Sequence, residues 1–306
     1  MMTAIRIKPA KTSILASVLV ASVSLVAPAA AQGFQLAPYK DKLFAYPATL
    51  EENDNGNFLR VAFNKQRDVY GRDRIPLRKA HYRYVNENVR WKRRLRSYRS
   101  PNGTFKHYEV GKPKGAKVTV IYVHGKGGNR RQGVNDWTFG GNFNRLQNLM
   151  ARNNGLLLTP DFSSFKDRGT TDIAALLSIY KQRSPRGKMV VACGSMGGGV
   201  CWRLAKNPDT ASLLDGMFIL GSHWHDDFLK SPTAKKGGRH IPIFFGHSTD
   251  DVVFSPKVQL GFYRRIKKQA PSYPLRFVLF DSGVHGTPIR MVDWRRELNW
   301  MLRINQ

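Results

Sequence analysis

Three side chains that together could perform nucleophilic catalysis follow separate apolar stretches of the chain: Ser195, Asp250 and His285. The serine lies in residues 193–197, Cys-Gly-Ser-Met-Gly, between an apolar run and a predicted helix. Serine is a weak nucleophile at its own pKa, so it needs a base within hydrogen-bond reach. Here Ser195 would attack a carbonyl carbon, His285 would take and return the proton, and Asp250 would fix the imidazole tautomer.

The elements that must position these groups are predicted by hydrophobic patterning. From residue 117 onward, short apolar and β-branched runs alternate with longer helical segments, which is typical of βαβ units around a mostly parallel sheet. Strands are predicted at 118–123, 155–160, 189–193, 217–220, 241–246 and 275–280. Helices are predicted at 142–152, 170–183, 197–206, 256–269 and 291–304. Several of the strands are apolar on both faces, as buried parallel strands are.

The chain order of these side chains resembles that of the α/β-hydrolases. Ser195, Asp250 and His285 each follow a predicted strand in the order serine, acid, histidine. The carboxyl ends of parallel strands meet at the edge of the sheet where ligands bind. The resemblance covers residues 117–306 and implies an α/β-hydrolase fold, a mostly parallel central sheet with helices on both faces. Cys193 departs mildly from the family's G-x-S-x-G motif, because cysteine is also small and apolar.

A second stretch, Tyr-Val-His-Gly-Lys-Gly-Gly at residues 122–128, is similar to the His-Gly loop after the third strand of the family's sheet. The resemblance implies that the backbone N–H of Lys126, or of Gly127, forms an oxyanion hole with that of Met196. Such donors hold the negative charge that develops on the carbonyl oxygen. We also expect substrate-binding residues in and beside this loop, Gly125, Gly127 and Arg130, the last because basic side chains there could meet an anionic group of the substrate.

Other residues compete for the acid and base roles. Asp250 lies four residues after Gly246, as in the family's G-x-x-x-D-x-x-V loop, which favours it over its neighbour Asp251. Two further carboxylates, Asp226 and Asp227, stay open as the acid, because some α/β-hydrolases carry it after the preceding strand. Chain order and flanking glycines favour His285 over the other candidate bases, His124 and His247.

Two smaller features bear on cofactors and crosslinks. Residues 221–227, Gly-Ser-His-Trp-His-Asp-Asp, hold two histidines and two carboxylates, but a zinc site needs more ligands in register than this segment offers. We therefore expect no metal and no cofactor, and expect the segment to line the pocket edge. Cys193 and Cys201 flank Ser195, and a bridge would need Cα atoms within about 7 Å. Since one cysteine ends a predicted strand and the other lies within the next helix, we expect two buried thiols.

Residues 1–31 have the anatomy of a secretory signal peptide. A basic start precedes an uncharged apolar run at residues 13–26, and three alanines end at Ala31. The run is shorter than the roughly 20 residues that a membrane-spanning helix needs. We therefore expect cleavage after Ala31 and a periplasmic or secreted protein.

The chain of 306 residues has 50 Lys and Arg against 21 Asp and Glu, a formal net charge of +29. Its hydrophobic content of 42% argues against a disordered basic polymer. Much of the charge lies in residues 32–116, which we expect to form a basic region packed on the core. Residues 82–110 contain Pro-Asn-Gly at 101–103 between two alternating runs, which predicts a β-hairpin. Its basic side chains, Arg93 and Arg94 among them, are expected on one exposed face.

This charge on an exported protein indicates a polyanionic partner, such as an anionic envelope polymer or a membrane surface. Nucleic acid is not expected, because the protein is predicted to leave the cytoplasm. The function predicted is an exported serine hydrolase that cleaves a small or polymer-linked carboxylic ester through an acyl-enzyme. Two alternatives remain open: a polyanion-binding envelope protein on a hydrolase scaffold, and a peptidase or acyltransferase with the same triad.

Overall fold

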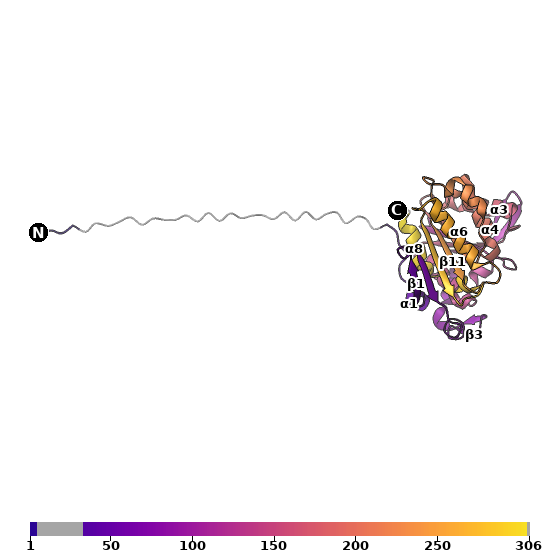
Figure 1. Cartoon of the computed structure of the whole chain (residues 1–306), viewed down its shortest axis with the longest axis horizontal. Helices are drawn as coiled ribbons and strands as arrows, with labels where there is room; N and C mark the ends of the chain where they lie inside the picture. Colours follow the sequence, from indigo (N-terminus) through magenta and orange to yellow (C-terminus); the bar gives the residue numbers. More distant parts are fainter. Residues whose placement is uncertain (5–32, 305–306) are drawn as a thin grey trace. The chain divides into compact units, whose positions relative to one another are not determined.

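The computed structural model of the chain describes residues 1–4 and 33–304 (Figure 1). The predicted signal peptide, residues 1–31, lies outside the described residues except for its first four. Two compact units divide the chain, Met1–Gln32 and Gly33–Gln306, and the described helices and strands all belong to the second. No helix within the described residues has both the length and the apolar character needed to cross a membrane.

A ten-stranded sheet runs through the second unit. In spatial order its strands are β1 (Thr49–Asn53), β2 (Phe58–Ala62), β12 (Leu275–Asp281), β11 (Ile243–Ser248), β10 (Gly216–Leu220), β9 (Lys188–Gly194), β7 (Val118–Val123), β8 (Leu156–Pro160), β6 (Gly103–Gly111) and β5 (Arg93–Ser100). Neighbouring strands are parallel from β2 to β8, and the pairs at the two edges are antiparallel. A separate pair is formed by β3 (Asp73–Ile75) and β4 (Lys79–Ala80).

Helices cover both faces of this sheet (Figure 1). They are α1 (Asp41–Phe44), α2 (Asn142–Arg152), α3 (Asp167–Arg183), α4 (Gly198–Lys206), α5 (Pro208–Ala211), α6 (Pro256–Gln269), α7 (Thr287–Met291) and α8 (Trp294–Ile304). Strand β7 shows how two cores arise, since all of its side chains are buried and successive ones point to opposite faces. Ile121 packs in the core of α3, α4 and α6, and Val120 packs in the core of α2 and α8. The predicted mostly parallel sheet with helices on both faces is confirmed.

The predicted helices and strands differ from the observed ones mainly near the C-terminus. Helices α2 and α6 have the predicted bounds, but the helix predicted at 291–304 is divided into α7 and α8. The break lies at Val292 and Asp293, because Val292 has extended backbone angles and the Asp293 carboxylate accepts the N–H of Arg296 at 3.2 Å. A side-chain oxygen that accepts a backbone N–H three residues on begins a new helix.

The basic N-terminal region is built into the sheet. Strands β1, β2, β5 and β6 all come from it, so the chain has no structural boundary at residue 117. Strands β5 and β6 pair antiparallel, with Ser100 opposite Gly103 across the turn. Residues 82–92, predicted as the first part of this hairpin, instead form the 3₁₀ helices η2 (Tyr82–Tyr84) and η3 (Glu87–Lys92). The side chain of Asn86 accepts the N–H of Asn88 at 3.1 Å and starts the second of them.

Candidate active site

The serine lies at a sharp turn between β9 and α4. Ser195 has a backbone φ of +50°, a left-handed conformation that non-glycine residues rarely adopt. A 3₁₀ turn, Ser195–Gly197, follows directly and leads into α4. A side chain at Gly197 would place its Cβ 2.6 Å from the carbonyl oxygen of Val123, so this position requires glycine. The turn has the strained geometry of a nucleophile elbow, which in this fold projects a serine above the sheet.

His285 lies between Ser195 and a carboxylate. Its Nε2 is 2.9 Å from Ser195 Oγ, and its Nδ1 is 2.9 Å from Asp251 Oδ2 and 3.0 Å from Asp251 Oδ1. An ionised carboxylate only accepts hydrogen bonds, so Nδ1 carries the ring proton and donates a hydrogen bond to Asp251. Nε2 is then an acceptor for the Ser195 hydroxyl, which is the arrangement a general base needs.

The carboxylate is Asp251, whereas the sequence favoured Asp250. Strand β11 continues to Ser248, two residues beyond the predicted end, so the loop begins later than the motif suggests. The backbone N–H of Asp250 donates to the carbonyl of Gly283 at 2.9 Å, and its exposed side chain accepts from Thr249 Oγ1 at 2.8 Å. That backbone bond joins the acid loop to the histidine loop and turns the next side chain, Asp251, inward.

Several donors hold Asp251 in its ionised form. Burial by itself favours the neutral acid, but hydrogen bonds from His285 and from the backbone N–H groups of Phe254 and Val253 outweigh it and lower the pKa of Asp251. The two backbone bonds measure 3.0 and 2.8 Å. His247 lies behind this carboxylate, with Nε2 donating to the carbonyl of Phe254 at 2.9 Å, and burial lowers its pKa. His247 is therefore a neutral support for the acid loop.

The other candidate acids and the metal candidate lie elsewhere. Asp226 pairs with Arg265 at 2.6 Å, and Asp227 pairs with Lys206 at 3.6 Å. Neither contacts His285. Over residues 1–4 and 33–304, no group of three or more His, Cys, Asp or Glu side chains is arranged to hold a metal ion.

The His-Gly loop lies against the serine. A Cβ at Gly125 would be 2.7 Å from Ser195 Cβ and 3.2 Å from its Oγ, so only glycine lets the loop approach this closely. The backbone N–H of Lys126, next in the chain, donates to no acceptor in the part of the chain that the structure describes. His124 is stacked on Phe162, with 4.6 Å between ring centroids, and its Nδ1 lies 2.9 Å from the carbonyl of Gly125. His124 thus shapes the loop and makes no contact with Ser195.

Arg130 is engaged differently from the prediction. Its guanidinium forms an ion pair with Asp161, whose other carboxylate oxygen accepts the Arg130 backbone N–H at 2.8 Å. The prediction that Arg130 binds substrate therefore stays a prediction for a side chain that already has a partner. Lys126 and Gly127 are exposed on the same loop.

Sequence reasoning missed Ser222, which holds the elbow from below. Its Oγ donates to the carbonyl oxygen of Ser195 at 2.5 Å, and its side chain is fully buried. A Cβ at Gly198 would lie 1.9 Å from this hydroxyl, so the glycine leaves the space that the hydroxyl fills. The available signal was position, because Ser222 follows β10 in a segment considered for metal, pocket-edge and triad-acid roles but not for support of the elbow.

The expectation of two free thiols is wrong. Cys193 and Cys201 form a disulfide, with their Cα atoms 6.3 Å apart and both residues fully buried. The bridge joins Cys193, the penultimate residue of β9, to Cys201, about one turn into α4, and Ser195 lies between them in the chain. The tight elbow brings strand and helix close enough for the bond, which the linear separation of eight residues does not reveal.

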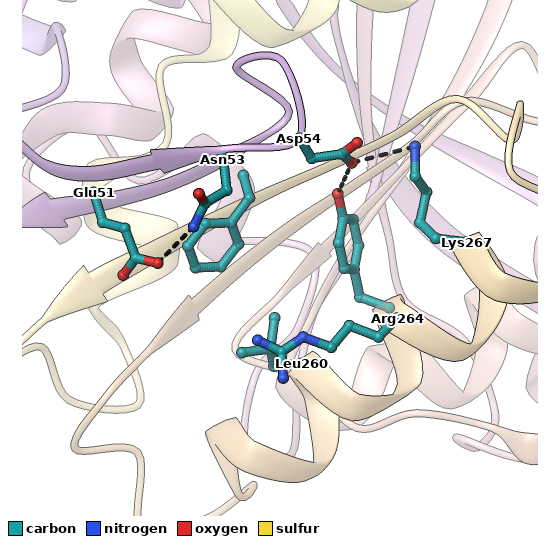
Figure 2. Close-up of a pocket in the computed structure, with 8 residues that line it drawn as sticks. Glu51, Asn53, Asp54, Leu260, Arg264 and Lys267 are labelled. Atoms are coloured by element: carbon teal, nitrogen blue, oxygen red, sulfur yellow. Dashed lines mark hydrogen bonds and ion pairs between the residues drawn. The ribbon is translucent and has the colours of Figure 1, made fainter.

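One pocket lies away from these residues. Figure 2 shows it between the turn that joins β1 to β2 and helix α6. Its volume is about 270 Å³. Asp54 accepts a hydrogen bond from Tyr263 at 2.7 Å and pairs with Lys267 at 3.2 Å. None of Ser195, Asp251 and His285 lines this pocket.

Comparisons with known proteins identify the fold. No family model matches the sequence, and no curated protein matches it either. Among solved structures, an esterase of Pyrococcus furiosus is similar over 72% of this chain and 96% of the esterase, with a TM-score of 0.53 and 14% identity. A serine hydrolase without a lid from Xanthomonas campestris is similar over 70% of this chain and 94% of its own, with a TM-score of 0.51 and 16% identity. The chain has the α/β-hydrolase fold.

Proposed function

We propose that this protein is a serine hydrolase that cleaves carboxylic esters through an acyl-enzyme. The observation that carries the proposal is the continuous hydrogen-bonded chain from Ser195 through His285 to Asp251. Its members lie after three different strands and meet at one edge of the sheet, as ligand sites in parallel sheets do. The name of the similar Pyrococcus furiosus protein, an esterase, supports the choice of ester over amide.

The geometry supports a mechanism in two half-reactions. As Ser195 Oγ attacks the ester carbonyl carbon, its proton passes to His285 Nε2, and the imidazolium is stabilised by Asp251. The carbonyl oxygen becomes an oxyanion, and the donors we propose for it are the backbone N–H groups of Lys126 and Met196. His285 then gives the proton to the departing alkoxide, which leaves as an alcohol. Water repeats the sequence on the acyl-enzyme, releasing the acid and restoring Ser195.

A fluorophosphonate probe tests the nucleophile. We expect the probe to label the wild-type protein at Ser195 and to leave Ser195→Ala unlabelled. The matched control is Ser282→Ala, since Ser282 also has a positive φ, of 58°, but contacts neither His285 nor Asp251. Labelling of Ser195→Ala equal to wild type would overturn the proposal. A panel of p-nitrophenyl esters, the matching p-nitroanilides and alcohol acceptors then separates esterase from peptidase and acyltransferase activity.

We also propose that the protein works outside the cytoplasm, near an anionic polymer or membrane surface. The disulfide between Cys193 and Cys201 supports an oxidising compartment, where such bonds persist. The edge strand β5 and the residue before it carry exposed basic side chains, Lys92, Arg94 and Arg99. Arg93 is not among them, because it pairs with Asp136 and hydrogen-bonds to Gln147.

Retention on an anionic resin tests the second proposal. Reversing the charge of Arg94 and Arg99 to Glu should lower the salt concentration at which the protein elutes. The control reverses the same number of charges at Lys235 and Lys236, which are exposed on a different part of the chain. Equal shifts in both variants would mean that retention depends on net charge alone and would contradict a specific basic surface.

A further inference from the structure

An apolar cavity begins beside the proposed catalytic histidine. Its volume is about 440 Å³, within the range of small-molecule sites. Val284 and Gly286, the two chain neighbours of His285, both line it. Because consecutive Cα atoms lie about 3.8 Å apart, the cavity wall starts one residue from the imidazole.

The opposite wall comes from the N-terminal region and from the loop before α2. Phe63, Val69 and Leu77 of the N-terminal region line the cavity, and so does Phe139. A Cβ at Gly286 would lie 3.6 Å from the ring of Phe139, so the histidine loop and the Phe139 loop are in contact. A segment outside the predicted catalytic core therefore completes a cavity at the catalytic edge.

The guanidinium of Arg290 and the hydroxyl of Thr287, which line the cavity, are already engaged. Arg290 is 4% exposed, and its guanidinium donates to both carboxylate oxygens of Asp73, at 3.1 and 2.6 Å, and to the carbonyl of Asp68 at 3.0 Å. Thr287 Oγ1 accepts the N–H of Val284 at 2.9 Å. A charged ligand would find no unpaired charged side chain among the lining residues, whereas a hydrocarbon group would meet phenylalanine, valine and leucine side chains.

Two of the residues that line this cavity have a strained backbone. Among the residues that the structure describes, eight non-glycine residues have a positive φ, and of these only Leu77, at +61°, and Phe139, at +51°, have large apolar side chains. Both line the cavity. The N–H of Leu77 donates to Asp73 Oδ2 at 2.7 Å, which holds this residue in place although it is 63% exposed. An exposed leucine held in a strained conformation indicates a functional site.

We propose that this cavity binds a hydrocarbon group of the ester substrate, so that the enzyme prefers esters with an apolar chain over acetyl or methyl esters. The inference rests on the proposed esterase function. The group belongs to the acyl chain or to the leaving alcohol, and the two sources share the same chemistry. Burial of each methylene then raises kcat/KM by about fourfold until the cavity is full.

Two series of esters test the proposal and separate its two sources. One varies the acyl chain of p-nitrophenyl esters from two to about ten carbons, and the other varies the alkyl group of acetate esters over the same range. A rise of kcat/KM in the first series assigns the cavity to the acyl chain, and a rise in the second assigns it to the alcohol.

The variants are Leu77→Asn and the double variant with Phe139→Asn, because asparagine tolerates the left-handed conformation and removes the apolar surface. In the double variant we expect the ratio of kcat/KM for the preferred chain to that for the two-carbon ester to fall about tenfold. Leu77→Asn alone, at an exposed position, should give a smaller fall in the same direction. The control Leu95→Asn, 45% exposed on β5, should leave this ratio unchanged. A flat chain-length profile in both series, or a ratio that neither variant changes, overturns the proposal.

Binding to inactive protein keeps this result separate from the proposed function. The neutral fluorophore N-phenyl-1-naphthylamine should bind Ser195→Ala and should lose most of its bound signal when Leu77→Asn is added. Absence of this difference overturns the cavity assignment whatever the activity. Absence of fluorophosphonate labelling and of ester hydrolysis, with the binding difference present, overturns the esterase and leaves an apolar ligand site.

Discussion

The catalytic edge of the sheet and the N-terminal region are held in place by different means. At the edge, short loops after β9, β11 and β12 bring Ser195, Asp251 and His285 together through hydrogen bonds of about 2.9 Å. The N-terminal region is fixed by buried ion pairs, of which Arg290 with Asp73 is one. A second joins Arg145, which is fully buried, to Asp293 at 2.9 Å and to Asp41 at 3.0 Å.

The difference shows that part of the positive charge is internal. Arg145 and Arg290 are among the residues that give the chain its net charge of +29, yet neither faces solvent. Substitutions at the edge should therefore reduce activity at nearly constant stability. Substitutions in the pairs of the N-terminal region should reduce stability first, because an unpaired buried charge is strongly destabilising.

The largest effect should come from the acid. Asp251→Asn should lower kcat/KM by on the order of 10⁴-fold, because the amide no longer holds His285 in the tautomer that accepts the serine proton. Asp250→Asn is the matched control, one residue away and exposed, and should change kcat/KM by less than about threefold. Steady-state kinetics on one activated ester compares them. A larger loss in Asp250→Asn would reverse the assignment.

The next effect should fall on stability in the N-terminal region. Asp73→Asn leaves the guanidinium of Arg290 buried without its carboxylate and should lower the free energy of unfolding by about 3 to 5 kcal/mol. Asp227→Asn removes an ion pair whose side chains are 57% and 38% exposed, so the loss there should stay below about 1 kcal/mol. Urea unfolding followed by circular dichroism measures both. Similar losses in the two variants would show that burial does not increase what an ion pair contributes to stability.

A pH effect of similar size should come from His107 on β6. Burial lowers its pKa from 6.5 to about 4, and its Nε2 lies 2.6 Å from Tyr180 Oη. Between these two pH values the unfolded chain binds a proton that the folded protein does not, so stability is full above 6.5 and falls toward pH 4. The difference between the two pKa values corresponds to a loss of roughly 3 kcal/mol in the free energy of unfolding. His107→Gln should flatten this part of the stability profile, whereas His81→Gln, at an exposed position, should leave it unchanged.

The smallest of these effects brings the two regions together. Replacing Cys193 and Cys201 by alanine should lower the free energy of unfolding by about 2 to 3 kcal/mol, as expected for a bridge that closes a short loop. This substitution lies at the catalytic edge but acts on stability, so it tests how far the two regions differ. Thermal unfolding of the double variant beside the oxidised wild type measures the loss. Equal midpoints would mean that packing alone holds the elbow.

The sequence was informative where function depends on local pattern. Ser195 and His285 follow from glycine-flanked turns after apolar strands, and these features are contained in a few consecutive residues. The choice between Asp250 and Asp251 could not be made from the local sequence, because it depends on where β11 ends and on a backbone hydrogen bond from Asp250 to Gly283. A shift of one residue along the loop therefore replaces the exposed side chain of Asp250 by the buried side chain of Asp251.

Tertiary contacts account for the remaining differences. Leu77 and Phe139 are far apart in the chain and have no motif, so only the folded protein brings them to one cavity. Ser222 reaches the Ser195 carbonyl from a different strand. The fold class was predictable because the alternation of strands and helices is repeated along most of the chain. The place of the N-terminal strands in the sheet was not, because β2 pairs with β12 and β6 pairs with β8, both far away in sequence.

The rate at which the buried disulfide is reduced can report how often the elbow opens. Thiol–disulfide exchange requires a thiolate to reach one of the sulfur atoms, and both Cys193 and Cys201 are fully buried. A reductant must therefore wait until β9 and α4 separate. At high thiol concentration the reduction rate should become independent of the reductant and equal the rate of that opening. The same bond that fixes the nucleophile thus offers a direct measure of how often its surroundings come apart.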